Sequence, residues 1–319
     1  MKRFSASTSK KLSALVIGIL IANVVVILLR ICSLKWFYDT EIGYYQADAP
    51  LPLLGNILLT VFVIGAALFA LFGFQKNELS LPKPTKLPRM VAILPAMAAL
   101  LATVGSMVSN DPSTYVSALP FKPSVLFTLC AICAFLVAIF FILLATGTLE
   151  KNKFGYLTLL IGFFALLYFV CALAIAYFDF EIQMNSPNKL IFMLANLSAV
   201  LAIFAEIRIL VGEPKPRFAL LAFSIATLLL GTSSIPSVFA YMSNIFPAHY
   251  RNLPADFVGM ALWCYCLIRL IWIAYPTEKK AVAEAEPSQE SKPTPEEEML
   301  TDETAEAEEK AVFPEENSN

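Results

Sequence analysis

Eight long apolar runs, separated by short polar segments, set the hydrophobic pattern of this sequence. Each run supplies the ~20 mostly apolar residues that an α-helix needs to cross a bilayer. In hydrocarbon every backbone amide must be satisfied within its own segment, so runs of this length form helices. None of them alternates polar and apolar residues as transmembrane strands do. We therefore predict an all-α bundle of eight transmembrane helices, over Leu12–Ile31, Leu53–Phe74, Met90–Val108, Val125–Leu149, Tyr156–Phe178, Leu190–Val211, Phe218–Met242 and Phe257–Tyr275.

A different pattern begins after Pro276, where aliphatic residues become rare and negative charge dominates. Residues 277–319 hold 14 acidic and 4 basic residues, whereas residues 1–276 hold 11 acidic and 19 basic ones. A segment with so little apolar bulk cannot bury enough surface to offset its ordering entropy. The sequence thus predicts two parts: an eight-helix transmembrane domain, 1–276, and a disordered acidic cytoplasmic tail, 277–319.

Composition and loop charge agree with a membrane location and indicate an orientation. Charged residues make up 15% of the chain, against about a quarter in an average soluble domain. Cytoplasmic loops carry an excess of Lys and Arg. Fourteen such residues near helix ends lie on the side of the N-terminus, and four lie on the other side. We predict a multi-pass protein of the cytoplasmic membrane of a bacterium, with both termini in the cytoplasm.

The stretch GTSSIPS, residues 231–237, interrupts the seventh apolar run. Pro236 has no amide hydrogen, so the carbonyl of Thr232 loses its helical partner, while Ser233 and Ser234 add hydroxyl groups. We predict a kinked or locally unwound segment near the middle of the bilayer. Broken helices of this kind line substrate and ion sites in secondary transporters. Proline and hydroxyl residues are also frequent in membrane helices, so both a ligand site and a structural kink stay open.

Glu206 and Arg269 are the most informative charges, because each lies inside its helix at a similar depth from the cytoplasmic end. An unpaired charge in the membrane costs ~2.5–3.5 kcal/mol at the helix centre and less near the ends. We therefore predict an ion pair between the sixth and eighth helices, which serves either as a proton or cation relay or as a structural pair. Snorkelling of both side chains to the interface is the third alternative, and we expect Arg30 to snorkel. Asn196 is expected to hydrogen-bond across helices.

These residues define one candidate ligand path. Its members are Thr232, Ser233, Ser234, Pro236, Asn196, Glu206 and Arg269.

Motifs for catalysis or cofactor binding are missing from the sequence. It contains no GxxxxGK[ST], HExxH or GxSxG motif, and the predicted helices contain neither Asp nor His. All six cysteines lie in or at the ends of apolar runs, where we expect packing rather than metal or redox chemistry. We therefore predict no cofactor, no metal-binding or catalytic residue, and no enzymatic activity.

The loop after the first predicted helix contains FYDTEIGYY, residues 37–45. Its aromatic residues suit the membrane–water interface, and its carboxylates do not have the spacing of a calcium loop. The stretch resembles a segment that follows the first helix in uncharacterised multi-pass membrane proteins of Gram-positive gut bacteria. The resemblance extends little beyond these residues and implies no activity, because that group has none assigned.

Two functions are compatible with these features. The favoured one is a membrane-embedded interaction or structural protein whose tail or loops meet a partner, because intramembrane charge is sparse and lies off-centre. The alternative is a small-solute or ion transporter that uses the candidate path. We expect the lipid bilayer and a protein that binds the tail as partners, and no nucleic acid; the sequence leaves the oligomeric state open.

The predicted topology places the loop around Lys83 and the tail on the same face of the membrane. In a variant whose native cysteines are replaced by alanine, Lys83→Cys and Lys279→Cys should both react with a membrane-impermeant maleimide from the cytoplasmic side only. Lys122→Cys should react from the opposite side. Labelling of positions 83 and 279 from different faces would contradict the topology.

Overall fold

The structure is a computed structural model, and it describes residues 6–39, 44–46, 48–74, 79, 81, 86–108, 123–151, 155–178, 186–212, 215–246 and 252–275. Its elements are α1 (Ala6–Phe37), β1 (Tyr38–Asp39), β2 (Tyr44–Tyr45), α2 (Pro50–Phe72), α3 (Lys86–Val91), α4 (Ile93–Val108), α5 (Pro123–Thr146), α6 (Thr148–Lys151), α7 (Gly155–Phe178), α8 (Pro187–Val211), α9 (Pro216–Met242) and α10 (Leu253–Ala274). The predicted tail, 277–319, lies outside the described residues.

All eight predicted spans are confirmed as helices that are long and apolar enough to cross a membrane. The ends differ from the predicted ones by several residues, most of all in α1, which is longer than its apolar run. The third span consists of α3 and the larger part of α4, over Lys86–Gly105. The described part of the chain is therefore an all-α membrane bundle.

Proline and glycine residues explain where the helices begin and break. Helices α2, α8, α9 and α10 carry proline in their first two positions, where a missing N–H costs nothing. Inside the third span, Pro95 leaves the carbonyl of Val91 without its helical donor, and a turn at Ala92 separates α3 from α4. Gly147 has a φ of +72° between α5 and α6, a left-handed conformation that glycine adopts without steric cost.

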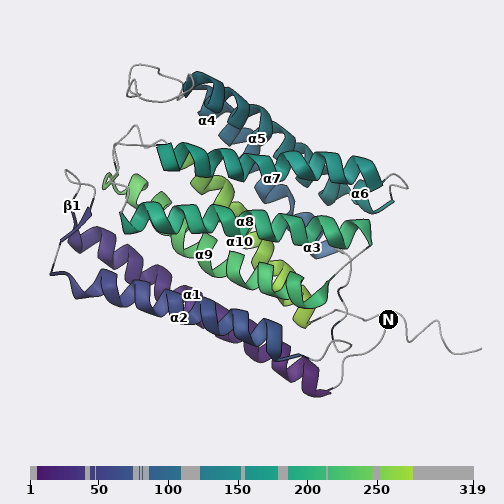
Figure 1. The fold of residues 1–319 in the computed structure, drawn as a ribbon, viewed down its shortest axis with the longest axis horizontal. Coiled ribbons are helices and arrows are strands. Elements are labelled where there is room, and N and C mark those ends of the chain that lie inside the picture. Colours follow the sequence, from purple (N-terminus) through teal and green to yellow (C-terminus); the bar gives the residue numbers. More distant parts are fainter. Residues whose placement is uncertain are drawn as a thin grey trace, which may run out of the picture. The chain divides into compact units, whose positions relative to one another are not determined.

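Helix α9 lies at the centre of the packing (Figure 1). It contacts α8 and α10 on one side and the α1–α2 pair on the other. Of its apolar segment 78% is buried, the largest share among the described spans, whereas α2 has the smallest share, 22%. Helices α4, α5 and α7 complete the bundle by connecting α10 to α8 through successive pairwise contacts. Polar residues of α9 are therefore enclosed by several other helices.

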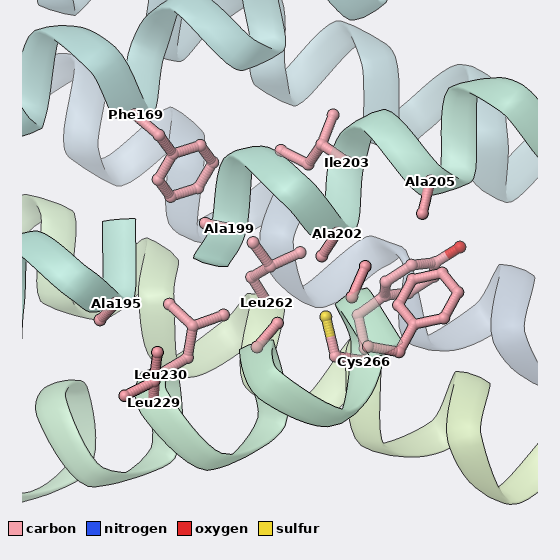
Figure 2. Close-up of a cluster of buried hydrophobic side chains, with 14 of the residues drawn as sticks. Phe169, Ala195, Ala199, Ala202, Ile203, Ala205, Leu229, Leu230, Leu262 and Cys266 are labelled. Carbon is pink, nitrogen blue, oxygen red and sulfur yellow. The ribbon is translucent and has the colours of Figure 1, made fainter. Parts of the chain in front are cut away.

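Small side chains on α8 allow this close packing (Figure 2). Ala195, Ala199 and Ala202 are buried at helical spacing, and they share one cluster with Leu230 of α9 and Leu262 of α10. Lipid is as apolar as leucine, so helices in a membrane associate through close van der Waals packing, which small residues permit. The core of α8, α9 and α10 follows that rule.

A short hairpin covers one end of α1. Strands β1 and β2 pair antiparallel with Tyr38 opposite Tyr45. The Tyr38 ring packs edge-on against the rings of Tyr45 and Phe246, with centroids 5.6 Å apart in each pair. We call this the hairpin end of the bundle, and the end at which α1 begins the N-terminal end.

Candidate functional site

Arg269 and Glu206 form a buried ion pair between α10 and α8. Arg269 Nε donates a hydrogen bond to Glu206 Oε2 at 2.9 Å. The relative exposure is 0% for Arg269 and 1% for Glu206. The ion pair that the sequence predicts is therefore confirmed, and both side chains turn into the bundle instead of snorkelling to the interface.

Aromatic side chains enclose this pair. The Arg269 guanidinium lies over the ring of Phe223 from α9, 5.6 Å from its centroid, a distance at which a cation is attracted to the ring face. Tyr265, one turn before Arg269 on α10, is fully buried and packs edge-on against Phe141 of α5. Four helices, α5, α8, α9 and α10, thus surround the pair. In such a setting its attraction is strong, because little water screens it.

Thr232 and Asn196 of the predicted path bond to their own helices, as does the neighbouring Ser237. Thr232 Oγ1 donates to the carbonyl of Leu228 at 2.7 Å, and Ser237 Oγ donates to that of Ser233 at 2.8 Å. Asn196 Nδ2 donates to the carbonyl of Phe192 at 2.8 Å, within α8. The expected hydrogen bond of Asn196 across helices is therefore not observed.

Helix α9 continues through residues 231–237 without interruption, with Pro236 inside it. The prediction of local unwinding is wrong. The Thr232 and Ser237 hydroxyls bond back to carbonyls one turn earlier, contacts that often bend a helix, so the predicted kink at Pro236 stays a prediction.

The small residues of this stretch serve close contact between helices. A Cβ atom at Gly231 would lie 2.6 Å from both Asn23 Oδ1 of α1 and Trp263 Nε1 of α10. On α10, a Cβ at Gly259 would lie 2.3 Å from Ser234 Oγ. Asn23 Nδ2 also donates to the carbonyl of Thr227 at 2.7 Å. Glycine and serine therefore stand in this apolar run because α1 and α10 approach α9 closely here.

A second polar cluster, at the hairpin end, joins α1, β2 and α8. Arg30 Nη2 donates to Asn188 Oδ1 at 2.7 Å, and the Tyr45 hydroxyl donates to the same oxygen at 2.8 Å. Arg30 is only 7% exposed, so the prediction that it snorkels is wrong. Burial raises the pKa of Tyr45 above its ordinary value, an effect that the charge of Arg30 partly opposes. Tyr45 is therefore a neutral hydrogen-bond donor at physiological pH.

Thr232 connects the predicted path to this Arg30 cluster. It lines a cavity of about 10 Å³ together with Arg30, Ser33, Tyr45 and Asn56. That size is at the lower limit for one water molecule. The structure thus brings Thr232 near Arg30, and it brings Glu206 to Arg269, but these are two separate clusters.

Asp256 is a buried carboxylate that the sequence analysis missed. It lies in the first turn of α10 with 0% exposure. The predicted span begins one residue later, so the expectation that no aspartate lies within a span is wrong. Pro254 in the first helical turn followed by an acidic residue is a signal of a helix start, and it would have included Asp256.

All six cysteines are free thiols, and Cys130, Cys133, Cys171 and Cys266 are buried. Within the described ranges, no three His, Cys, Asp or Glu side chains are grouped as metal ligands. Neither observation adds a site to the two polar clusters.

Comparison with protein-family models, curated proteins and solved structures finds no match to this chain. Fold and packing define its class, a polytopic membrane protein with eight long apolar helices in the part of the chain that the structure describes. Its function must therefore be inferred from the arrangement of its own residues.

We predict that Glu206→Gln destabilises the bundle by about 3–5 kcal/mol, because removal of one partner leaves a buried charge unpaired. The free energy of unfolding in detergent measures this change. Adding Arg269→Met should recover much of the loss. Arg208→Gln on the same helix is the matched control, since Arg208 is partly exposed, and it should cost less than about 1 kcal/mol. Equal effects of the Glu206 and Arg208 variants would refute a structural role for the pair.

Gly231→Ala should lower the free energy of unfolding by about 1–3 kcal/mol, because its Cβ overpacks the contact with Asn23 and Trp263. Gly65→Ala is the control, since no atom lies within 4 Å of its Cβ position. That change should be neutral or stabilise by up to about 1 kcal/mol, as alanine is the better helix former. Thermal denaturation of both variants tests the difference, and a loss at position 65 as large as at 231 would contradict close packing as the cause.

Proposed function

We propose that this protein is a structural or interaction protein of the bacterial cytoplasmic membrane, with both termini in the cytoplasm, rather than an enzyme or a carrier. The observation that supports this most is how core polar groups are used. Glu206 and Arg269 bind each other, and the side chains of Thr232, Ser237 and Asn196 bond to their own helices. These bonds hold the helices of the bundle together, and they use one of the two carboxylate oxygens of Glu206.

The carrier alternative requires polar groups that converge on one cavity near the midplane of the membrane. Of the candidate path, Thr232 lines the small cavity beside Arg30, and no member lines the groove between α1 and α2. Glu206 and Arg269 lie in the last turns of α8 and α10, close to the N-terminal end. This distribution favours structural roles.

The acidic segment 277–319 supplies the interaction that we propose. It contains 14 acidic and 4 basic residues, so it would attract a partner with a basic surface, steered by charge. Its stretch AVFPEE, residues 311–316, combines an aromatic anchor with two carboxylates. A docking peptide of this kind binds after the bundle has anchored the chain at the membrane.

Photocrosslinking in native membranes tests the interaction. A photoreactive residue in place of Phe313 in the full chain should yield one dominant adduct. The adduct should disappear at 0.5 M salt, where the Debye length falls below about 5 Å, and when the tail sequence is scrambled at constant composition. A chain ending at residue 276, which lacks the crosslinker at position 313, should still insert normally. Adducts of equal intensity from the scrambled tail would overturn sequence-specific docking.

Liposome flux separates this proposal from the carrier. Vesicles containing the purified full chain should take up protons, cations and small solutes no faster than empty vesicles. Uptake above that level, abolished by both Glu206→Gln and Thr232→Val, would establish transport and overturn the proposal.

A further inference from the structure

An apolar groove opens on the outer surface of the bundle between α1 and α2. It has a volume of about 390 Å³, and Leu228 of α9 forms part of its lining. Gly18 and Gly65 lie in its walls and are exposed. A Cβ at either glycine would meet no atom within 4 Å. The groove therefore has room for a ligand beside α1 and α2, whereas the surroundings of Gly231 are closely packed.

Two cations lie at one end of this groove, where α2 ends. Lys11 Nζ donates to the carbonyl of Gly73 at 3.2 Å, and Arg217 Nη2 donates to the carbonyl of Phe74. Lys11 precedes Gly18 by two helical turns and thus shares its face of α1. Arg217 precedes Leu228 by three turns and shares its face of α9. The two cations therefore lie on the same faces of α1 and α9 that line the groove, nearer to the N-terminal end.

Lys11 retains donors beyond the α2 carbonyls. An ammonium group has three N–H donors, and the described residues use one from Lys11. Arg217 Nε is buried, so Arg217 contributes its positive charge to this end of the groove, and Lys11 supplies the accessible donors. Carbonyls at a helix C-terminus carry only a partial negative charge. The end of the groove is thus suited to an additional anion.

The length of the groove and its cationic end identifies the occupant. The α1 lining extends from Ala14 to Ala22, a rise of about 12 Å, and Lys11 extends the site to about 16 Å. This is close to half of the ~30 Å hydrocarbon core, which is the depth of one leaflet. A partner transmembrane helix would need a contact surface that crosses both leaflets. A phospholipid needs a surface only as deep as one leaflet. Basic pockets between membrane helices on the cytoplasmic side bind anionic headgroups, and that is the side to which we assign the N-terminal end.

We propose that this groove binds one anionic phospholipid, with its phosphate at Lys11 and Arg217 and one acyl chain between Gly18 and Gly65. The site is independent of any partner of the tail. A zwitterionic lipid has the same acyl chains but no net charge for the two cations to bind. A second copy of the protein has neither a phosphate nor an acyl chain.

Native mass spectrometry of the purified full chain, titrated with phosphatidylglycerol or phosphatidylcholine of identical acyl chains, tests the proposal. The wild-type chain should retain one phosphatidylglycerol in preference to phosphatidylcholine. Lys11→Gln should reduce this preference about fivefold, the equivalent of about 1 kcal/mol for one cation near the membrane surface. Lys11 is exposed, so the variant should keep the wild-type melting temperature.

Filling the groove tests the acyl-chain half of the site. Gly65→Leu should reduce the binding of both lipids at least tenfold without a change in melting temperature. Gly155→Leu is the matched control, because position 155 lies at the start of α7 and also has no atom within 4 Å of its Cβ position; it should bind lipid as the wild type does. An unchanged lipid preference in Lys11→Gln, or full lipid retention in Gly65→Leu, would overturn the proposal. A change of oligomeric state in Gly65→Leu with lipid binding intact would instead assign the groove to a second copy.

Discussion

Close approach of neighbouring helices to α9 is the constraint on which the rest of the bundle depends. Hydrocarbon does not drive helices together, so their association relies on packing and on polar contacts. Gly231 meets Asn23 and Trp263, and Gly259 meets Ser234. A larger side chain at either glycine would push α1 or α10 away from α9. The hydrogen bond from Asn23 to Thr227 and the core contacts of α10 would then be lost together.

The buried charged groups also depend on close contact between neighbouring helices. Arg269 lies fully inside the bundle because Glu206 is within hydrogen-bond distance and Phe223 offers its ring face. A lone guanidinium at that position would have to reach the interface or distort the bilayer. Arg30 donates a hydrogen bond to the neutral amide oxygen of Asn188, and that oxygen also accepts one from the Tyr45 hydroxyl. One cluster thus ties α8 to α10 near the N-terminal end, and the other ties α1 to α8 and the hairpin at the opposite end.

The two polar clusters join helices in the interior of the bundle. The groove, in contrast, opens on the outer surface, where a ligand can reach it. Several core side chains bond to one another or to their own backbone, whereas Glu206 Oε1 and the Tyr265 hydroxyl have no hydrogen-bond partner among the described residues. In contrast, Lys11 is exposed and keeps unused donors, and Arg217 adds a second positive charge, beside free apolar space on the surface. A protein built in this way has its interactions with lipid and with partners at its periphery. That arrangement is consistent with a structural or interaction role and with the proposed lipid site.

Local residue order alone determined the helical class, the eight spans and the pairing of Glu206 with Arg269, because bilayer thickness fixes span length and an unpaired buried charge is costly. It also located the special stretch at residues 231–237, where local unwinding is not found and a kink stays a prediction. Whether Thr232 and Ser237 bond to a ligand or to their own helix depends on the helices around them. The burial of Arg30 and Asp256, and the free space beside Gly18 and Gly65, likewise depend on which helices meet. Only the tertiary structure decides such contacts, since sequence spacing specifies a face of a helix but not the neighbour that covers it.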